Sequence, residues 1–357
     1  MRRPLHPFRR RLWLAAGILI VVLGAEVGAR GVAPYLPPPA RYGDAATAVK
    51  VAQLDRGEAS NRCTPVVVVG NSMARDAIDP TIVSGELPGS PATYNAALDA
   101  ANPALLRRWL SDEVLPRARP RLVVAAVSSL DLNGASKAGT AALTAYNGAP
   151  ATAAGTIGRL GSWFDSRSVF MQHRRTLADA TIWAPTLEHL RTGTPTAAPD
   201  EDRLATVIGP DGAGRSRRRS SYVPQNSAVR AFVQQQLLND FTIDATTTES
   251  LIDLVQSIQA HDDTAVVLVA LPVTDEFIGL HPRGAADFDE YLAVMRRVAT
   301  ATSVPFVDLH AGALPAHFAD THHLNGVGAT ALSTALAARL RDPGVALTEA
   351  NVTCRGR

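Results

Sequence analysis

The sequence predicts an α/β domain built on a parallel β-sheet. Short apolar runs, typical of buried strands, alternate with longer segments in which apolar residues recur at helical spacing. One of these runs, TPVVVVGNSM, passes directly from four valines into Gly-Asn-Ser, which indicates a buried strand entering a tight turn. Hydrophobic residues make up 46% of the 357 residues, so the chain can form a sizeable core.

The N-terminus combines a basic segment with an apolar one. Residues 1–11 carry five arginines, and a run of 14 apolar residues without charge, LWLAAGILIVVLGA, follows. Counted to Ala29, the segment has 18 residues. As a helix it would span about 27 Å, close to a hydrocarbon core of about 30 Å. We therefore predict a cytoplasmic N-terminus at 1–11 and a transmembrane signal anchor at 12–32, with the rest of the chain outside the cytoplasm.

A cleaved signal peptide is the alternative, because the small residues VGA precede Arg30. Both interpretations carry the remaining chain across the membrane. The Pro-rich stretch PYLPPPARYG then begins a spacer, which we place at 33–62.

The elements of the α/β domain, predicted to span 63–342, follow in order. The apolar runs predict four strands, at residues 66–70, 123–129, 264–272 and 304–309. Helical periodicity, with an Asn-Pro start signal in the first case and a possible capping box of Thr and Glu in the second, predicts helices at 102–116, 246–262, 285–302 and 325–340. Residues 135–225 break this alternation and are predicted to form an insertion or lid, and 343–357 form a C-terminal tail.

Composition excludes several classes of protein. The formal net charge of +2 argues against a dedicated nucleic-acid binder. The two cysteines form no C-x-x-C motif, and neither a dinucleotide-binding glycine motif nor a Walker loop is present. We therefore expect no cofactor.

Ser72 follows the first predicted strand, at the edge where parallel sheets form their sites. A helix beginning just after it would direct backbone N–H groups toward negative charge near its hydroxyl. This is a suitable position for a nucleophile, although a serine there could also simply cap the helix.

The stretch DTHHLNGVG supplies candidate partners for Ser72. Asp320 and His323 are three residues apart, so on a helical turn they would share a face, whereas His322 should point elsewhere. Ser72, His323 and Asp320 would then be the nucleophile, the base and the group that orients the base. A metal site is the alternative, with ligands drawn from His310, His317, Asp320, His322 and His323.

These motifs resemble those of the SGNH (GDSL-like) hydrolases over about residues 60–135 and 264–342. Gly70–Ser72 matches the family's nucleophile block, and Asp320–His323 matches its last block, D-x-x-H. YNAALDAANP and VVAAVSSLDLN occupy the places of the middle blocks, where the family usually has a glycine and Gly-x-Asn-Asp. Here Ala96 and Ala97 follow Asn95, and Leu130 stands where the asparagine of the oxyanion hole is expected.

The resemblance implies a flavodoxin-like three-layer sandwich and a serine esterase or O-acyltransferase. Ser72, Asp320 and His323 would be catalytic, and the oxyanion donors would be the Ser72 backbone N–H with Asn95 or Asn133. The layout is closest to membrane-anchored envelope proteins related to alginate O-acetylation and teichoic-acid D-alanylation. The implied partners are the membrane, an acylated envelope polysaccharide or other acyl ester, and a membrane-bound O-acyltransferase. A catalytically inactive relative that binds glycan or scaffolds the acyltransferase is the alternative.

The two cysteines are predicted to form a disulfide. Cys63 precedes the first strand, at the sheet edge opposite the site, and the helix after His323 should end near Leu340 at the same edge. The segment that follows is long enough to bring Cys354 to Cys63, and an extracytoplasmic domain lies where disulfides persist. The alternative is two independent thiols.

Overall fold

The structure is a computed structural model that describes residues 7–36, 45–59, 63–147, 168–170, 173, 177, 183–195, 208–215, 221, 227–342 and 345. The chain divides into two compact units. The first comprises Met1–Ala45 and Asn147–Glu201, and the second comprises Ala46–Tyr146 and Asp202–Arg357. The second unit contains the sheet and the candidate site.

A five-stranded, entirely parallel sheet forms the centre of the second unit, with the strand order β2-β1-β3-β4-β5. The strands are β1 (Val66–Gly70), β2 (Thr93–Asn95), β3 (Leu122–Ala126), β4 (Ala265–Ala270) and β5 (Phe306–Asp308). This is the flavodoxin-like order of doubly wound folds, in which sites form outside the carboxyl ends of the strands where the order reverses. Gly70 at the end of β1 pairs with Ala126 at the end of β3, so both chains leave the sheet at one edge.

The four predicted strands form β1, β3, β4 and β5, and the predicted parallel α/β fold is confirmed. Strand β2 was not predicted. It has only three residues, Thr-Tyr-Asn, and it forms by parallel pairing with β1, without an alternation of apolar and polar residues of its own. A strand of this length is too short for periodicity to reveal.

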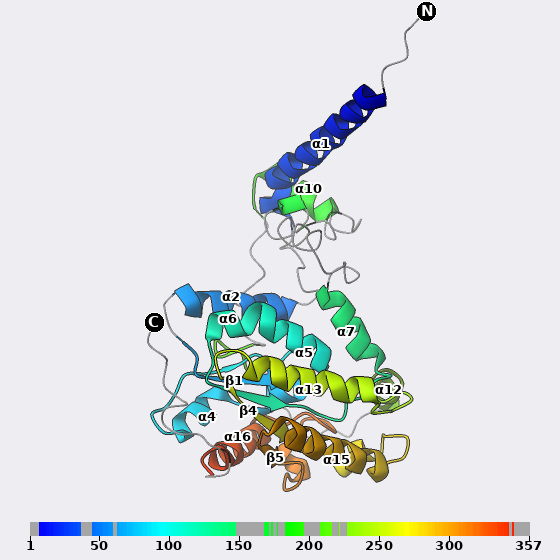
Figure 1. Cartoon of the computed structure of the whole chain (residues 1–357). Coiled ribbons are helices and arrows are strands. Elements are labelled where there is room, and N and C mark those ends of the chain that lie inside the picture. The colour runs from blue at the N-terminus through cyan, green and yellow to red at the C-terminus, as the bar shows by residue number, and fades with distance from the viewer. Residues whose placement is uncertain are drawn as a thin grey trace, which may run out of the picture. The chain divides into compact units, whose positions relative to one another are not determined.

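Helices cover both faces of the sheet (Figure 1). One face carries α5 (Pro103–Trp109), α13 (Ala245–Gln259) and α15 (Ala285–Thr302), which contact one another through α13. The other carries α3 (Ser72–Ala77), α4 (Pro80–Glu86) and α16 (Gly326–Leu340), where α16 contacts both α3 and α4. Further helical segments among the described residues are α2 (Ala45–Ala59), the π-helical η2 (Leu110–Val114), α6 (Leu115–Ala118), α7 (Lys137–Asn147), α12 (Ser227–Phe232), the π-helical η4 (Val233–Leu237), α14 (Asp275–Ile278) and the 3₁₀ turn η5 (Pro315–His317).

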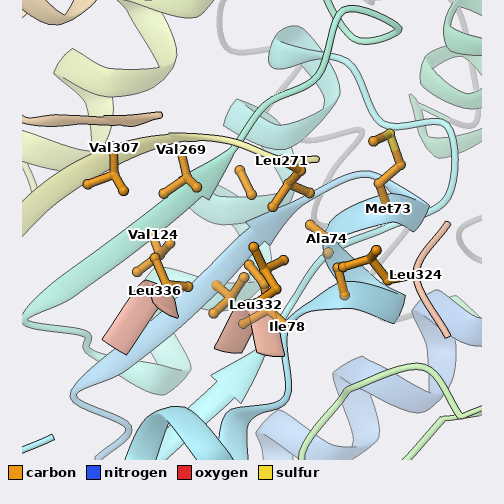
Figure 2. Close-up of a cluster of buried hydrophobic side chains, with 14 of the residues drawn as sticks. Met73, Ala74, Ile78, Val124, Val269, Leu271, Val307, Leu324, Leu332 and Leu336 are labelled. Atoms are coloured by element: carbon orange, nitrogen blue, oxygen red, sulfur yellow. The ribbon is translucent and has the colours of Figure 1, made fainter. Parts of the chain in front are cut away.

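Alternate residues of the strands build the core on the α16 face. Val124, Val269 and Val307 point from three neighbouring strands toward Leu332 and Leu336 of α16 (Figure 2). Leu336 is completely buried. The spacing of these two leucines by four residues explains why the small-residue-rich sequence of α16 forms a helix that packs closely on the sheet.

The predicted helices form with small differences at their ends. The segment 102–116 forms α5, η2 and α6 in succession, and the predictions at 285–302 and 325–340 match α15 and α16. Helix α13 begins at Ala245 and is capped by Asp244, whose side chain accepts the Thr247 N–H, instead of by the predicted Thr and Glu box. Asp244 was missed because several neighbouring residues could serve as the cap.

Part of the predicted spacer is a packed element. Residues 45–59 form α2, and Lys50 of this helix is completely buried. Its Nζ donates to the backbone oxygens of Asn95 and Gly212, each at 2.5 Å. Residue 212 belongs to the predicted insertion, so one lysine joins α2, the end of β2 and a returning loop. The α/β domain therefore begins before residue 63.

The predicted insertion is also divided. Its segment 147–201 belongs to the first unit, whereas 137–146 and 208–214 belong to the second. The first unit contains α1 (Pro7–Val32), the 3₁₀ turn η1 (Ala33–Tyr35) and α10 (Trp183–Thr192). Within this unit the carboxylate of Glu26 accepts hydrogen bonds from the Ser168 hydroxyl and from the N–H groups of Val169 and Phe170.

The helix predicted at the N-terminus is present as α1, but its role in the membrane gains no support. Among the residues described here, none of the helices has the length and apolar character needed to cross a bilayer. The Glu26 carboxylate pairs with Arg30 at 2.7 Å near the end of α1.

Cys63 is disulfide-bonded, and no free cysteine is found among the described residues. The chain contains two cysteines. Cys354, the predicted partner, lies outside the described part of the chain.

Candidate active site

The turn after β1 places Ser72 at the carboxyl edge of the sheet. Gly70 has φ of 153°, and a Cβ there would lie 2.2 Å from the backbone oxygen of Ala126, so only glycine fits beside β3. Asn71 caps α3, because its side chain accepts the Met73 N–H. The alternative that Ser72 merely caps the helix is therefore not what the structure shows, and the Ser72 hydroxyl faces a different partner.

Asn71 also ties this turn to the loop after β3. Its amide donates to the Ser128 hydroxyl at 2.9 Å and to the Asp131 carboxylate at 2.7 Å. Asp131 in turn accepts the Ser128 N–H at 2.8 Å. Burial raises the pKa of Asp131 to about 7, although these hydrogen bonds favour the charged form. The network holds the nucleophile turn against the neighbouring strand end.

Ser72, His323 and Asp320 form a continuous hydrogen-bonded chain. The Ser72 Oγ lies 2.9 Å from His323 Nε2, and His323 Nδ1 lies 2.8 Å from Asp320 Oδ2. With Nδ1–H donating to Asp320, the imidazole presents an unprotonated Nε2 to the hydroxyl. These are the contacts that a nucleophile, a base and an orienting carboxylate need.

The Asp320–His323 pair lies in a tight loop and not on a helical turn as we expected. The Ala319 N–H donates to the His323 backbone oxygen at 2.8 Å, and the Asp320 carboxylate accepts the backbone N–H groups of His322 and His323. Asn325 then caps α16 through Val327 and Gly328. Burial alone would raise the pKa of Asp320, but the hydrogen bond and charge of His323 hold it well below its ordinary value. Asp320 is therefore ionised throughout the neutral range.

A cavity of about 310 Å³ opens onto the three residues. Arg75 and Asp99 form one ion pair in its wall, with Arg75 Nη1 2.5 Å from Asp99 Oδ1. Apolar residues also line it: Ala100, Leu130, Ala138, Phe232, Val233 and Leu237. Polar residues contribute as well, among them Asn71, Asn102, Asp131 and Ser136. Phe232 and Leu237 come from α12 and η4, so the segment that follows the predicted insertion forms part of the wall.

The predicted oxyanion side chains are both engaged elsewhere, so these assignments are wrong. The Asn95 amide is completely buried and donates to the backbone oxygens of Ala74 and Ile78, each at 2.9 Å. The Asn133 amide donates to the backbone oxygens of Leu237 and Asn239. Both asparagines satisfy buried carbonyl groups, which costs free energy to undo. Leu130, which cannot donate, lines the cavity instead.

The alternative metal site is reduced to three residues. Asp320, His322 and His323 have ligand atoms within 4.8 Å of one another, the one such group found among the described residues. His310 instead pairs with Asp308, with 2.5 Å between Nδ1 and Oδ1. The His322 ring packs on Phe277 and on His323, with 4.1 Å between the two imidazole centroids. Asp320 and His323 are already engaged with one another and with Ser72.

Sequence reasoning missed Asp131, Arg75, Asp99 and Phe232. Asp131 follows closely on the end of β3, and a polar residue at that place in a parallel sheet is a signal that could have been used. Arg75 is one turn of helix after Ser72, so its position at the site follows from helical spacing. No local signal marks Asp99 or Phe232, because they reach the cavity only through tertiary packing.

Comparison with known proteins gives similarities of fold only at low scores. No protein-family model matches the chain. No curated protein matches it either. Among solved structures, a Bacteroides fragilis protein assigned as an acylhydrolase is 14% identical, with a TM-score of 0.37, over 80% of this chain and 93% of that one. An inhibitor-bound aryl esterase from M. smegmatis is 11% identical, with a TM-score of 0.36, over 77% of this chain and 97% of that one. A gut microbial enzyme that metabolises diltiazem is 11% identical, with a TM-score of 0.27, over 70% of this chain and 37% of that one.

The strand order and the places of the three site residues along the chain define the architecture. The 2-1-3-4-5 parallel sheet carries a serine directly after β1 and an Asp–His pair just before the last helix, all at one edge. This is the flavodoxin-like arrangement, with a serine after the first strand and an Asp–His pair before the last helix, that the SGNH resemblance implied.

Proposed function

We propose that the protein is an SGNH-type serine hydrolase or O-acyltransferase that acts on ester bonds. The observation that carries this proposal is the Ser72 Oγ to His323 Nε2 distance of 2.9 Å, with Asp320 on the far nitrogen of the ring. A hydroxyl–imidazole distance near about 3 Å distinguishes a competent nucleophile from an inactive relative, in which the histidine turns away. The geometry therefore favours an enzyme over a glycan-binding scaffold.

The reaction divides into two acyl transfers. Ser72 Oγ attacks the ester carbonyl carbon while its proton passes to His323 Nε2. The tetrahedral intermediate collapses, the bond to the alcohol oxygen breaks, and His323 returns the proton to that oxygen. Water or an acceptor hydroxyl then attacks the acyl-serine, gives its proton to His323 and regenerates the Ser72 hydroxyl. The carboxylate of Asp320 holds the imidazole tautomer and stabilises the imidazolium that forms.

Backbone groups are the proposed oxyanion donors. Ser72 is the first residue of α3, and N–H groups of a first helical turn have no acceptor within the helix. Ala100, whose backbone lies in the left-handed region with φ of 50°, lines the same cavity. A serine hydrolase with only backbone donors near the carbonyl still stabilises the developing negative charge.

The test is labelling by a fluorophosphonate followed by mass analysis of the peptide that contains Ser72. We expect labelling and ester hydrolysis in the full-length protein and neither in Ser72→Ala. Ser90→Ala is a matched control on a serine that does not line the cavity, and it should retain both activities. Labelling or hydrolysis that persists in Ser72→Ala would remove this assignment.

The cellular setting is a second part of the proposal. The basic and apolar N-terminus suggests a membrane-tethered, extracytoplasmic enzyme that modifies acylated envelope polysaccharide beside a membrane-bound O-acyltransferase. The disulfide at Cys63 supports an oxidising compartment. Fractionation of cells with protease protection tests the location. Comparing polysaccharide acylation in cells with Ser72 or Ser72→Ala tests the reaction, because a mutant with more acylation indicates an esterase and one with less indicates a transferase.

A further inference from the structure

We infer that the cavity beside Ser72 binds the apolar acyl chain of the ester, and that Leu130 determines this specificity. The inference rests on the proposed function. It names a substrate class that neither the motifs nor the comparisons supply, namely esters of linear acyl groups longer than acetyl. Chains of about four to eight carbons suit a cavity of this size.

The size of the cavity is the first argument. Its volume of about 310 Å³ corresponds to roughly ten waters at about 30 Å³ each. An acetyl group, with only one methyl beyond the carbonyl, would leave most of this space filled by water. A longer chain would displace that water and bury apolar surface.

The lining is the second argument. Leu130 and Val233 are 8% and 1% exposed, and both belong to the main apolar core of the domain. The wall they form is therefore continuous with packed side chains and is rigid. Phe232 is 55% exposed and lines the same cavity, as does Leu237 at the end of η4. An aromatic ring exposed at a cavity mouth is suited to cover a hydrocarbon chain that leaves it.

The charges are the third argument. The cation in the wall, Arg75, is already neutralised by Asp76 at 2.9 Å and by Asp99 at 2.5 Å. Asp131 and Asp320 add further carboxyl groups. Arg75 is the one Arg or Lys side chain among the described residues that line the cavity, so a negatively charged acyl group, such as a dicarboxylic half-ester, would meet a surplus of carboxyl groups. An uncharged chain meets no such penalty.

Leu130 is the residue that sets the polarity and the size of the acyl group that the cavity accepts. It lies between Ser129 and Asp131, whose side chains are committed to buried hydrogen bonds with His281 and Asn71. Leu130 thus contributes the apolar group that this loop presents to the cavity beside Ser72. An amide at this position would place donors and acceptors against the acyl chain, and buried polar groups without partners disfavour apolar ligands.

The experiment measures kcat/KM of the full chain for p-nitrophenyl acetate, butanoate, hexanoate and decanoate. Each methylene that becomes fully buried is worth about fourfold. Because burial in an open cavity is partial, we expect kcat/KM for the hexanoate ester to exceed that for the acetate ester by at least about tenfold. Hydrolysis of both esters should be lost in Ser72→Ala. Leu130→Asn, a substitution of similar side-chain size, should lower the hexanoate-to-acetate ratio by about tenfold. Leu314→Asn is the matched control, since Leu314 is 61% exposed and lies outside the cavity lining, and the ratio should not change.

A second series separates the acyl side from the alcohol side. It uses ethyl, butyl and hexyl acetate, in which only the alcohol grows. An increase with chain length confined to this series would overturn the assignment to the acyl group. Ser72-dependent hydrolysis with acetate as the best acyl group, or an unchanged ratio in Leu130→Asn, would overturn the inference and leave the proposed function intact. Absence of Ser72-dependent hydrolysis for every ester would overturn both.

Discussion

At the residue scale, the tautomer of one imidazole decides whether the site can react. Asp320 accepts from His323 Nδ1 at 2.8 Å and stays ionised because the imidazole lowers its pKa. The same carboxylate also receives two backbone N–H groups of its own loop. The residue that orients the base therefore also fixes the loop that carries it.

Replacing Asp320 by Asn should separate these two roles. An amide can still contact the loop, but it no longer enforces a proton on Nδ1, so Nε2 is protonated in a larger fraction of molecules and cannot accept the Ser72 proton. We expect kcat/KM for ester hydrolysis to fall by about a hundredfold or more, with little change in KM. Steady-state kinetics and circular dichroism of Asp320→Asn measure this. A folded variant with wild-type kinetics would show that Asp320 is not the orienting group.

At the element scale, a buried cation is one of the contacts that join α2 to the domain. Lys50 donates to the backbone oxygens of Asn95 and Gly212, which otherwise face a dry interior. Burial, assisted by the charge of Arg75, lowers the pKa of Lys50 to about 7, and the carboxylates of Asp99, Asp211 and Asp76 oppose this. Lys50 thus links the 208–215 loop and α2 to β2, although keeping its ammonium group charged in the interior costs free energy.

This arrangement predicts a pH dependence of stability. Between pH 7 and the ordinary pKa of about 10.4, the unfolded chain binds a proton on Lys50 that the folded protein does not. The free energy of unfolding of the wild type should therefore rise with pH across this window relative to Lys50→Met, in which the group is absent. At pH 8 we expect Lys50→Met to be less stable by about 1–3 kcal/mol, because two buried carbonyls lose their donor.

Urea unfolding of both proteins from pH 7 to 10 gives the difference directly. Lys137→Met is the matched control, because Lys137 is the other lysine of the chain and is exposed on α7. Its difference from wild type should not vary with pH. A difference between wild type and Lys50→Met that stays flat or falls with rising pH would show that Lys50 remains charged in the folded protein.

At the scale of the whole molecule, the site is assembled from segments far apart in the chain. The turn after β1, the loop after β3, η4 and the loop before α16 meet at one edge of the sheet. The disulfide at Cys63 lies just before the opposite end of β1. A covalent link there should restrict the unfolded chain without touching the catalytic edge.

Reduction of the disulfide should therefore lower the free energy of unfolding and leave the reactivity of Ser72 nearly unchanged. We expect dithiothreitol, or Cys63→Ser, to lower the free energy of unfolding by about 2–5 kcal/mol. Fluorophosphonate labelling of Ser72 at 25 °C should stay within about twofold, provided that the protein is still folded by circular dichroism. A folded, reduced protein that no longer labels would place the disulfide in the catalytic machinery.

The sequence by itself determined the class of fold and marked the candidate catalytic residues. Ser72, Asp320 and His323 stand in local motifs, and the apolar runs of β1, β3, β4 and β5 are long enough for periodicity to show. The positions of β2, α2 and the oxyanion asparagines depended on tertiary contacts instead. Asn95 ends β2 and Asn133 lies in the loop after β3, where a catalytic amide could be, but carbonyls of α3, of η4 and of the segment after η4 accept their amide hydrogens. A local pattern records which side chains are present at an edge, whereas only the packed structure decides which hydrogen-bond partner each one meets.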